Sequence, residues 1–144
     1  MTGLDVRPAR DTKEVEAALV LREQVFCGEQ GVSIDAERDG RDRDAAHLVA
    51  LAEGRVLATC RLLLADGTVR LSRMAVEPSA RRRGVGSALL AHAEDWAREA
   101  SAQRITLHAQ MPVKPLYDGA GYTARGQPFF EEGIEHVLME KSVA

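Results

Sequence analysis

The stretch that most constrains this 144-residue chain is residues 71–100, where a short apolar segment, a basic loop and a helical pattern follow one another. Residues 71–76 are predicted to form the end of a strand, because Pro78 has no backbone N–H and disfavours helix at the residue before it. After the loop, apolar residues recur every three or four positions, which predicts an amphipathic helix as far as Ala100. The loop therefore lies at a helix N-terminus.

This loop has the properties of a cradle for a phosphate or pyrophosphate. The first turn of a helix exposes backbone N–H groups that have no intrahelical partner, and the helix dipole adds partial positive charge there. The two glycines lack a Cβ that would keep a ligand's oxygens away, and three arginines add charge and donors. The residues expected to bind the phosphate are Arg81, Arg82, Arg83, Gly84, Val85, Gly86 and Ser87.

Two common phosphate-binding motifs do not fit this loop. A Walker loop needs a lysine after its second glycine, and a dinucleotide-binding fingerprint needs a third glycine where Leu89 stands. The pattern that remains is [QR]-x-x-G-x-[GA], carried by Arg81, Gly84 and Gly86. Between a strand and a helix, this pattern resembles the coenzyme A pyrophosphate loop of the GNAT N-acetyltransferases.

Composition indicates one globular domain, residues 1–144, with 45% hydrophobic and 28% charged residues. The net charge of −3 makes the arginine cluster a local feature, which argues against a nucleic-acid partner. No apolar run reaches the length of a membrane span, and the N-terminus lacks the apolar region of a signal peptide. Cys27 and Cys60 lack metal-ligand spacing, so we expect no metal, free thiols and a cytoplasmic location.

The remaining patterns predict an α/β (α+β) fold with a mixed, mostly antiparallel sheet flanked by helices. Strands are expected at residues 4–7, 47–52, 56–64, 69–76, 104–109, 122–124, 129–130 and 135–140. Besides the helix after the loop, helices are expected at 12–26, closed by Gly28, and at 113–118. Residues 32–44 are expected to be a solvated loop, with an acidic lip that attracts a cationic substrate as the less favoured interpretation.

The resemblance implies a GNAT-type sheet of six to seven strands with about four helices, splayed where acetyl-CoA enters. It also implies that backbone groups of Met74, Ala75 and Val76 pair with the pantetheine arm of acetyl-CoA. The N–H of Val76 or of its neighbour would then polarise the thioester carbonyl. Tyr117 opens the family pattern Y-x-x-x-G-[FY], which implies a tyrosine near the sulfur that protonates the departing thiolate; alternatively, Tyr117 packs in the core.

The residue that takes the proton from the amine is not fixed by the pattern. Histidines titrate near neutrality, and His108 is expected on the strand that borders the cleft. Glu29, at the end of the first helix, can hold a substrate ammonium or order a water. The candidate catalytic residues are therefore Tyr117, Glu29 and His108, and the candidate substrate-binding residues are Glu29, Gln30 and His136.

Flanking residues resemble the ElaA-like branch of the GNAT family. The similarity lies in R-x-x-V-F-x-x-E-Q from Arg22 to Gln30, in Asp39, and in G-I-x-H from Gly133 to His136. It implies an N-acetyltransferase that moves the acetyl group of acetyl-CoA directly to a primary amine without a covalent intermediate. The alternative is a non-catalytic acyl-CoA-binding regulatory domain. A small amine or amino sugar is the favoured acceptor, ahead of a peptide amine, and homodimers are common for this fold.

Overall fold

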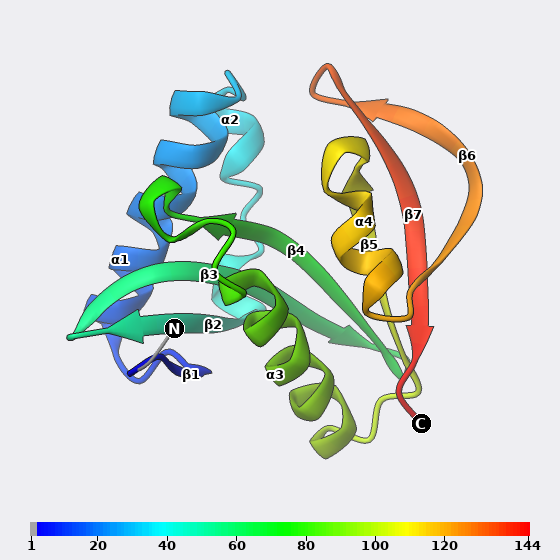
Figure 1. Cartoon of the computed structure of the whole chain (residues 1–144), viewed down its shortest axis with the longest axis horizontal. Coiled ribbons are helices and arrows are strands. Elements are labelled where there is room, and N and C mark those ends of the chain that lie inside the picture. The colour runs from blue at the N-terminus through cyan, green and yellow to red at the C-terminus, as the bar shows by residue number, and fades with distance from the viewer. Residues whose placement is uncertain (1–2) are drawn as a thin grey trace.

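The computed structural model describes residues 3–144 and contains one seven-stranded sheet (Figure 1). The spatial order of its strands is β1 (Asp5–Pro8), β2 (Ala46–Ala52), β3 (Arg55–Ala65), β4 (Thr68–Val76), β5 (Arg104–Gln110), β7 (Ile134–Ser142) and β6 (Thr123–Glu131). The helices are α1 (Thr12–Arg22), α2 (Ile34–Glu37), α3 (Val85–Glu99) and α4 (Lys114–Gly119). Within residues 3–144, only β4 and β5 pair in parallel; the other neighbours are antiparallel. The predicted mostly antiparallel sheet with four helices is confirmed.

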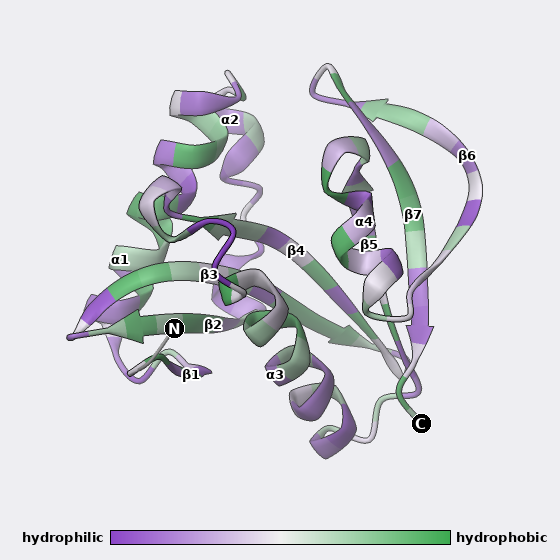
Figure 2. Cartoon of the chain, in the orientation of Figure 1, coloured by the Kyte–Doolittle hydropathy of each residue, from purple (hydrophilic) through white to green (hydrophobic). Residues whose placement is uncertain are grey.

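Helices α1 and α3 pack on opposite faces of the sheet, and the alternation of side chains along β2 shows how. Leu48 belongs to the large buried cluster that contains Leu89 of α3, whereas the next residue, Val49, packs with Ala18 of α1. A strand covered on both faces is apolar throughout, and Figure 2 shows β2 as almost continuously hydrophobic. The same figure shows the loop that leads into α3 as hydrophilic.

Strands β4 and β5 are joined only at one end. Their parallel register covers three pairs, from Thr68 with Arg104 to Arg70 with Thr106. Beyond Arg70, β4 continues to Val76 along β3, while β5 continues along β7. In Figure 1 the two strands converge near the C-terminus and separate toward α4. The splayed sheet expected from the family resemblance is therefore present.

The first helix ends differently from the prediction. The α-helix stops at Arg22, and the chain continues as a wider π-helix, η1 (Glu23–Glu29). Gly28 lies inside η1 and is not the closing residue; Gly31, with φ of +73°, is the glycine that adopts the left-handed conformation after it. π-Helical turns are rare in proteins, and those that occur are often found at functional sites. Here the turn ends at Glu29, one of the predicted site residues.

Residues 32–44 were expected to be a solvated loop; most of them are exposed, but the segment is partly helical and its Glu37 is buried. The segment forms α2 and a 3-10 turn, η2 (Asp42–Asp44), and its carboxylates pair with arginines of α1, β3 and β4. We call Arg22, Glu37, Asp39, Asp42, Arg61 and Arg73 the ion-pair cluster. Because arginines of the same chain neutralise these carboxylates, they do not form an open acidic lip for a cationic substrate.

The ion-pair cluster reaches into the core. Arg22 and Glu37 are each 1% exposed and lie 2.8 Å apart, and Arg61 lies 2.7 Å from Asp39. The guanidinium of Arg61 holds the pKa of Asp39 far below the ordinary value of an aspartate. The cluster thus fastens the segment between η1 and β2 to the middle of the sheet.

The two short strands predicted near the C-terminus are one strand. β6 runs from Thr123 to Glu131, and its register against β7 shifts between Arg125 and Phe129, at the glycine-containing stretch that suggested a break.

In the described residues, no helix is long and apolar enough to cross a membrane.

Candidate active site

A cavity of about 580 Å³ occupies the space where β4 and β5 separate. It is bounded by β4, the loop before α3, the end of η1, β5 and α4. The predicted site residues that line it are Glu29, Gln30, Met74, Val76, Arg81, Arg82, Gly84, Val85, Gly86, Ser87, His108 and Tyr117. Segments from five parts of the chain therefore converge on one cavity.

Three predicted site residues lie outside the lining of this cavity. Ala75 is buried on the opposite face of β4, where it packs with Leu21 of α1. Arg83 lines a separate surface depression beside Ser79. His136 lines a smaller pocket next to the cavity.

A bulge in β4 directs its last residues toward the cavity. One extra residue of β4 lies opposite β3 near Arg73, whose φ is +56°. A left-handed backbone at a non-glycine residue costs about 1–3 kcal/mol. The side chain of Arg73 is held by Glu37, 3.0 Å away, and by other members of the ion-pair cluster. The cluster therefore holds Arg73, and with it the bulge, in place.

The backbone of Val76 is aimed into the cavity. The N–H of Glu77 donates to the carbonyl of Leu57 on β3, over 2.8 Å. Because successive N–H groups of a strand point to opposite edges, the N–H of Val76 points away from β3, to the edge that β5 leaves open. An extended ligand in the cavity can pair with this edge as a further strand would.

The loop before α3 presents unpaired helix amides. Gly84 is the N-cap of α3, with φ of +79° and ψ of +9°, and in the described chain no side chain caps this helix. Nothing lies within 4 Å of a Cβ placed on Gly84, so its left-handed backbone, rather than crowding, requires glycine. The first amides of a 15-residue helix therefore face the cavity uncapped, which fits a pyrophosphate.

The three arginines of this loop differ in what they contact. Arg81 donates two hydrogen bonds to the carboxylate of Glu29, at 2.7 and 2.9 Å, and its Nε donates to the carbonyl of Val76 at 2.9 Å. Arg82 and Arg83 are exposed and make no ion pair within the described residues. Arg81 therefore ties η1 to the end of β4, whereas the other two guanidinium groups stay available to a ligand.

The ion pair with Arg81 affects the basicity of the Glu29 carboxylate. The hydrogen bonds from Arg81 lower the pKa of Glu29 below its ordinary value. A carboxylate with a lowered pKa is a weaker base. The neighbouring Gln30 forms a second bridge, because its amide and that of Gln110 on β5 exchange two hydrogen bonds of 3.2 and 3.0 Å. Together these two residues connect η1 to both sides of the cavity.

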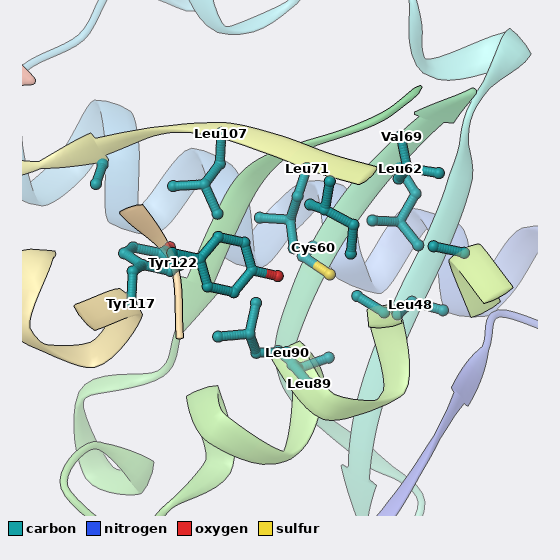
Figure 3. Close-up of a cluster of buried hydrophobic side chains, with 14 of the residues drawn as sticks. Leu48, Cys60, Leu62, Val69, Leu71, Leu89, Leu90, Leu107, Tyr117 and Tyr122 are labelled. Carbon is teal, nitrogen blue, oxygen red and sulfur yellow. The ribbon is translucent and has the colours of Figure 1, made fainter. Parts of the chain in front are cut away.

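Tyr117 lines the cavity while most of its side chain is buried. It is 7% exposed, its ring packs edge-on against Tyr122, and its hydroxyl lies 3.7 Å from Sδ of Met74. Figure 3 shows the two tyrosines within the cluster of buried side chains that includes Cys60 and Leu90. Burial raises the pKa of Tyr117, so the phenol is protonated at neutral pH. It can therefore donate a proton to a group in the cavity.

His108 lies on the β5 side of the cavity and contacts Glu131. Its Nδ1 lies against the carboxylate of Glu131 and 2.9 Å from a guanidinium nitrogen of Arg70, and Phe129 packs edge-on at 4.9 Å. Burial, followed by the charge of Arg70, lowers the pKa of His108, and Glu131 acts in the opposite direction. The imidazole is therefore mostly neutral at pH 7 and can accept a proton.

Glu131 is a site residue that the sequence did not indicate. It lies 23 residues from His108 along the chain. Their contact depends on the order β5-β7-β6, which no local motif reports.

The two cysteines have environments that disfavour a covalent intermediate. Burial raises the pKa of the Cys60 thiol to about 12, and desolvation also raises the pKa of Cys27. The thiolate is the nucleophilic form of cysteine, so neither residue is activated.

Comparisons with known proteins agree with this geometry. The family model described as acetyltransferase (GNAT) domain matches residues 10–143. The chain is 30% identical over 134 residues to the uncharacterized N-acetyltransferase YjcF of Bacillus subtilis, covering 92% of this chain and 96% of that protein. It is also similar to the crystal structure of an acyl-CoA N-acyltransferase from Pseudomonas aeruginosa, with a TM-score of 0.85, 32% identity, and coverage of 96% and 99%.

The predicted similarity to ElaA is seen when the two structures are compared. The crystal structure of Escherichia coli ElaA matches with a TM-score of 0.86 and 22% identity, covering 96% of this chain and 99% of that chain. The matched family model spans nearly all of the described residues, including the open edge of β4 and the loop before α3. The chain belongs to the GNAT acetyltransferase family.

Proposed function

We propose that this protein transfers the acetyl group of acetyl-CoA directly to a primary amine, without a covalent enzyme intermediate. The observation that carries the proposal is the continuous path from the open edge of β4 at Val76 to the uncapped N-terminus of α3 at Gly84, within one cavity. Membership of the GNAT family supports acyl transfer as the reaction class.

The cofactor side of the site consists mainly of backbone groups. The first amides of α3, with Arg82, would hold the pyrophosphate, while Arg83 lines a separate depression. The free edge of β4 at Met74 and Val76 would hold the pantetheine arm, and acetyl-CoA supplies the activated acyl group. Arg81 would act indirectly, since its bonds to Glu29 and to the carbonyl of Val76 fix the geometry of the loop.

Starting from the ammonium form of the acceptor, two protons must leave the nitrogen, the second to solvent after the carbon–nitrogen bond has formed, and one proton must reach the sulfur. His108 takes the proton from the ammonium form of the acceptor, and the neutral amine attacks the thioester carbonyl. The N–H of Val76 stabilises the negative charge on the carbonyl oxygen. As the carbon–sulfur bond breaks, Tyr117 donates its proton to the thiolate. We assign proton acceptance to His108 rather than Glu29, because Glu29 is already paired with Arg81.

The first experiment is the thermal midpoint with and without acetyl-CoA, with CoA, ATP and NAD as further ligands. A ligand that binds only the folded state adds about 2.7 kcal/mol of stability at a hundredfold excess over its dissociation constant. We expect both CoA species to raise the midpoint. Equal stabilisation by ATP, or none by CoA, would contradict the assignment of the loop.

Catalysis is tested with Tyr117→Phe. We expect thiol release from acetyl-CoA in the presence of an amine to slow by about 10²–10⁴-fold, because the phenol proton is lost. The midpoint shift with CoA should be retained, since the ring stays in place. A non-catalytic acyl-CoA-binding domain would show the midpoint shift but no amine-dependent thiol release in either protein.

A further inference from the structure

One imidazole nitrogen of His108 is contacted by two groups of opposite charge. The carboxylate of Glu131, on β6, lies against Nδ1, and a guanidinium nitrogen of Arg70, on β4, lies 2.9 Å from the same atom. In the neutral ring, a carboxylate accepts a hydrogen bond from Nδ1 only when this nitrogen carries the proton, whereas a guanidinium donates to Nδ1 only when it does not. The two contacts therefore require different tautomers of His108.

The contact with Glu131 is the stronger of the two. It is partly buried, whereas the contact with Arg70 is exposed to solvent. A charge-assisted hydrogen bond is stronger where water is excluded, and an exposed guanidinium has other donors and can direct them to water. Glu131 therefore determines the tautomer and places the proton on Nδ1.

The second ring nitrogen of His108 is left open. Nε2 makes no hydrogen bond within residues 3–144, and among these residues Nδ1 of His47 is the one side-chain nitrogen or oxygen that is both buried and unpaired. Nε2 of His108 is therefore accessible, on a residue that lines the main cavity. When the proton is on Nδ1, Nε2 has a free lone pair and can accept a proton.

The strand that carries Glu131 also packs against the imidazole ring. Phe129 lies edge-on to His108, with ring centroids 4.9 Å apart, and it stacks with His136 at 6.1 Å. Phe129 and Glu131 have one residue between them on β6, so their side chains lie on the same face of the sheet. β6 therefore supplies both an aromatic neighbour and the hydrogen-bond acceptor for His108.

We propose that Glu131 is a positioning residue for acetyl transfer, because it holds His108 in the tautomer whose Nε2 acts as the base. The proposal rests on the proposed function, in which His108 takes the first proton from the ammonium group. Nε2 receives that proton, and Glu131 stabilises the imidazolium that results. The nitrogen then bonds to the acetyl carbon as the carbon–sulfur bond breaks, its second proton goes to solvent, and Tyr117 protonates the sulfur. The imidazolium returns its proton to solvent before the next cycle.

The groups that face His108 act on its pKa in different directions. Arg70 on β4 and His136 on β7 lower the pKa, as burial does, whereas Glu131 on β6 raises it. Glu131→Ala should therefore lower the pKa of His108 further, and Arg70→Ala should raise it. Loss of a merely structural contact would not move the pKa in opposite directions in these two variants.

Nuclear magnetic resonance of the imidazole nitrogens tests the tautomer without any ligand. The signals of His108 among the four histidines are assigned by comparison with His108→Gln. At about pH 8, where the ring is neutral, we expect wild type and Arg70→Ala to carry the proton on Nδ1. In Glu131→Ala, Arg70 donates to Nδ1 without a competitor, so the proton should move to Nε2. Glu135→Ala, which removes an exposed carboxylate of β7, is the matched control and should leave the proton on Nδ1.

Thiol release from acetyl-CoA tests the role in transfer. The acceptors are propylamine, glucosamine and alanyl-alanine, which represent a small amine, an amino sugar and a peptide amine, and the variants are compared with the fastest of them. We expect kcat of Glu131→Ala to fall by about tenfold or more, within the roughly 10²–10⁴-fold that a general base contributes. Its KM for acetyl-CoA should stay the same. The acid limb of the pH–rate profile should move to lower pH in Glu131→Ala and to higher pH in Arg70→Ala.

The possible results separate this proposal from the proposed function. If wild type releases thiol but His108 carries its proton on Nε2, the positioning role is overturned and acetyl transfer stands. The same conclusion follows if Glu131→Ala keeps the wild-type tautomer, acid limb and kcat. If CoA gives no midpoint shift and none of the three amines releases thiol, the proposed function fails, and the role of Glu131 in transfer fails with it.

Discussion

Two arginine-rich segments of this protein differ in whether their charged side chains are paired within the chain. Residues 35–44 and 81–87 each mix arginine with glycine on a polar background. The first also contains acids, and it folds onto the sheet, where its charges pair with Arg22, Arg61 and Arg73. The second contains no acid, and Arg82 and Arg83 stay exposed, Arg82 in the lining of the main cavity and Arg83 in a separate depression. The comparison teaches that interleaved opposite charge lets a segment close on its own chain, whereas one sign of charge leaves it open to a ligand.

The largest expected effect comes from disrupting the ion pairs of residues 35–44, the closed segment; residues 81–87 are the open segment. Glu37→Gln leaves the buried Arg22 guanidinium without its main partner and weakens the hold on Arg73. We expect the free energy of unfolding to fall by about 3–5 kcal/mol, measured by urea denaturation. Arg83→Ala, in the open segment, should change it by less than about 0.5 kcal/mol. Similar losses in both variants would mean that the two segments do not differ as described.

A second test separates backbone strain from ligand binding. Gly84→Ala and Gly31→Ala place a Cβ at left-handed positions, φ of +79° and +73°, with nothing within 4 Å of it. Each should lose about 1–2 kcal/mol of stability because the strain is the same. Only Gly84→Ala should also reduce the midpoint shift with CoA. An equal reduction in Gly31→Ala would show that strain alone weakens binding.

A third test measures how much an exposed arginine of the open segment contributes to CoA binding. Arg82→Ala should raise the dissociation constant of CoA by about 10- to 150-fold, since a charge-assisted hydrogen bond contributes about 1.5–3 kcal/mol. Arg43→Ala, an exposed arginine of the closed segment, should leave that constant unchanged. Calorimetric titration measures both, and the prediction is wrong if the two variants lose the same affinity.

The smallest effect concerns Asp39 and depends on pH. Its pKa in the folded protein is held below the ordinary value by Arg61, so its contribution to stability is complete above the ordinary aspartate pKa of 3.8. That contribution is lost as pH falls through the lower, folded-state pKa. The stability difference between wild type and Asp39→Asn should therefore be constant near neutrality and shrink below about pH 4. A difference that grows with acid would contradict the pairing.

The local features of the fold could be predicted from the sequence. The strand before Pro78, the loop around Gly84 and the helix after it follow from turn chemistry and apolar spacing over adjacent residues, and all three are present. The parallel neighbour β5 follows from the crossover through α3.

Features that depend on distant residues could not be predicted in this way. Arg61 and Asp39 are 22 residues apart, so the charges of residues 32–44 gave no local sign of burial. The residue types in the π-helix that carries Glu29 are those of an ordinary α-helix. The two kinds of helix differ in their backbone hydrogen bonds, which the sequence does not reveal. The contacts around His108 and Glu131 depend on such distant residues, and for that reason the sequence pattern describes the loop before α3 better.

The three-pair junction of β4 and β5 has a mechanical consequence. It divides the sheet into two leaves, β1–β4 and β5–β7, that share backbone hydrogen bonds at one end only. The amide of Val76 on the open edge has no ladder partner toward β5, so it exchanges with solvent deuterium unless something else accepts from it. A molecule in that gap therefore completes the secondary structure of the protein. Its presence is recorded in the exchange rates of the backbone before any reaction takes place.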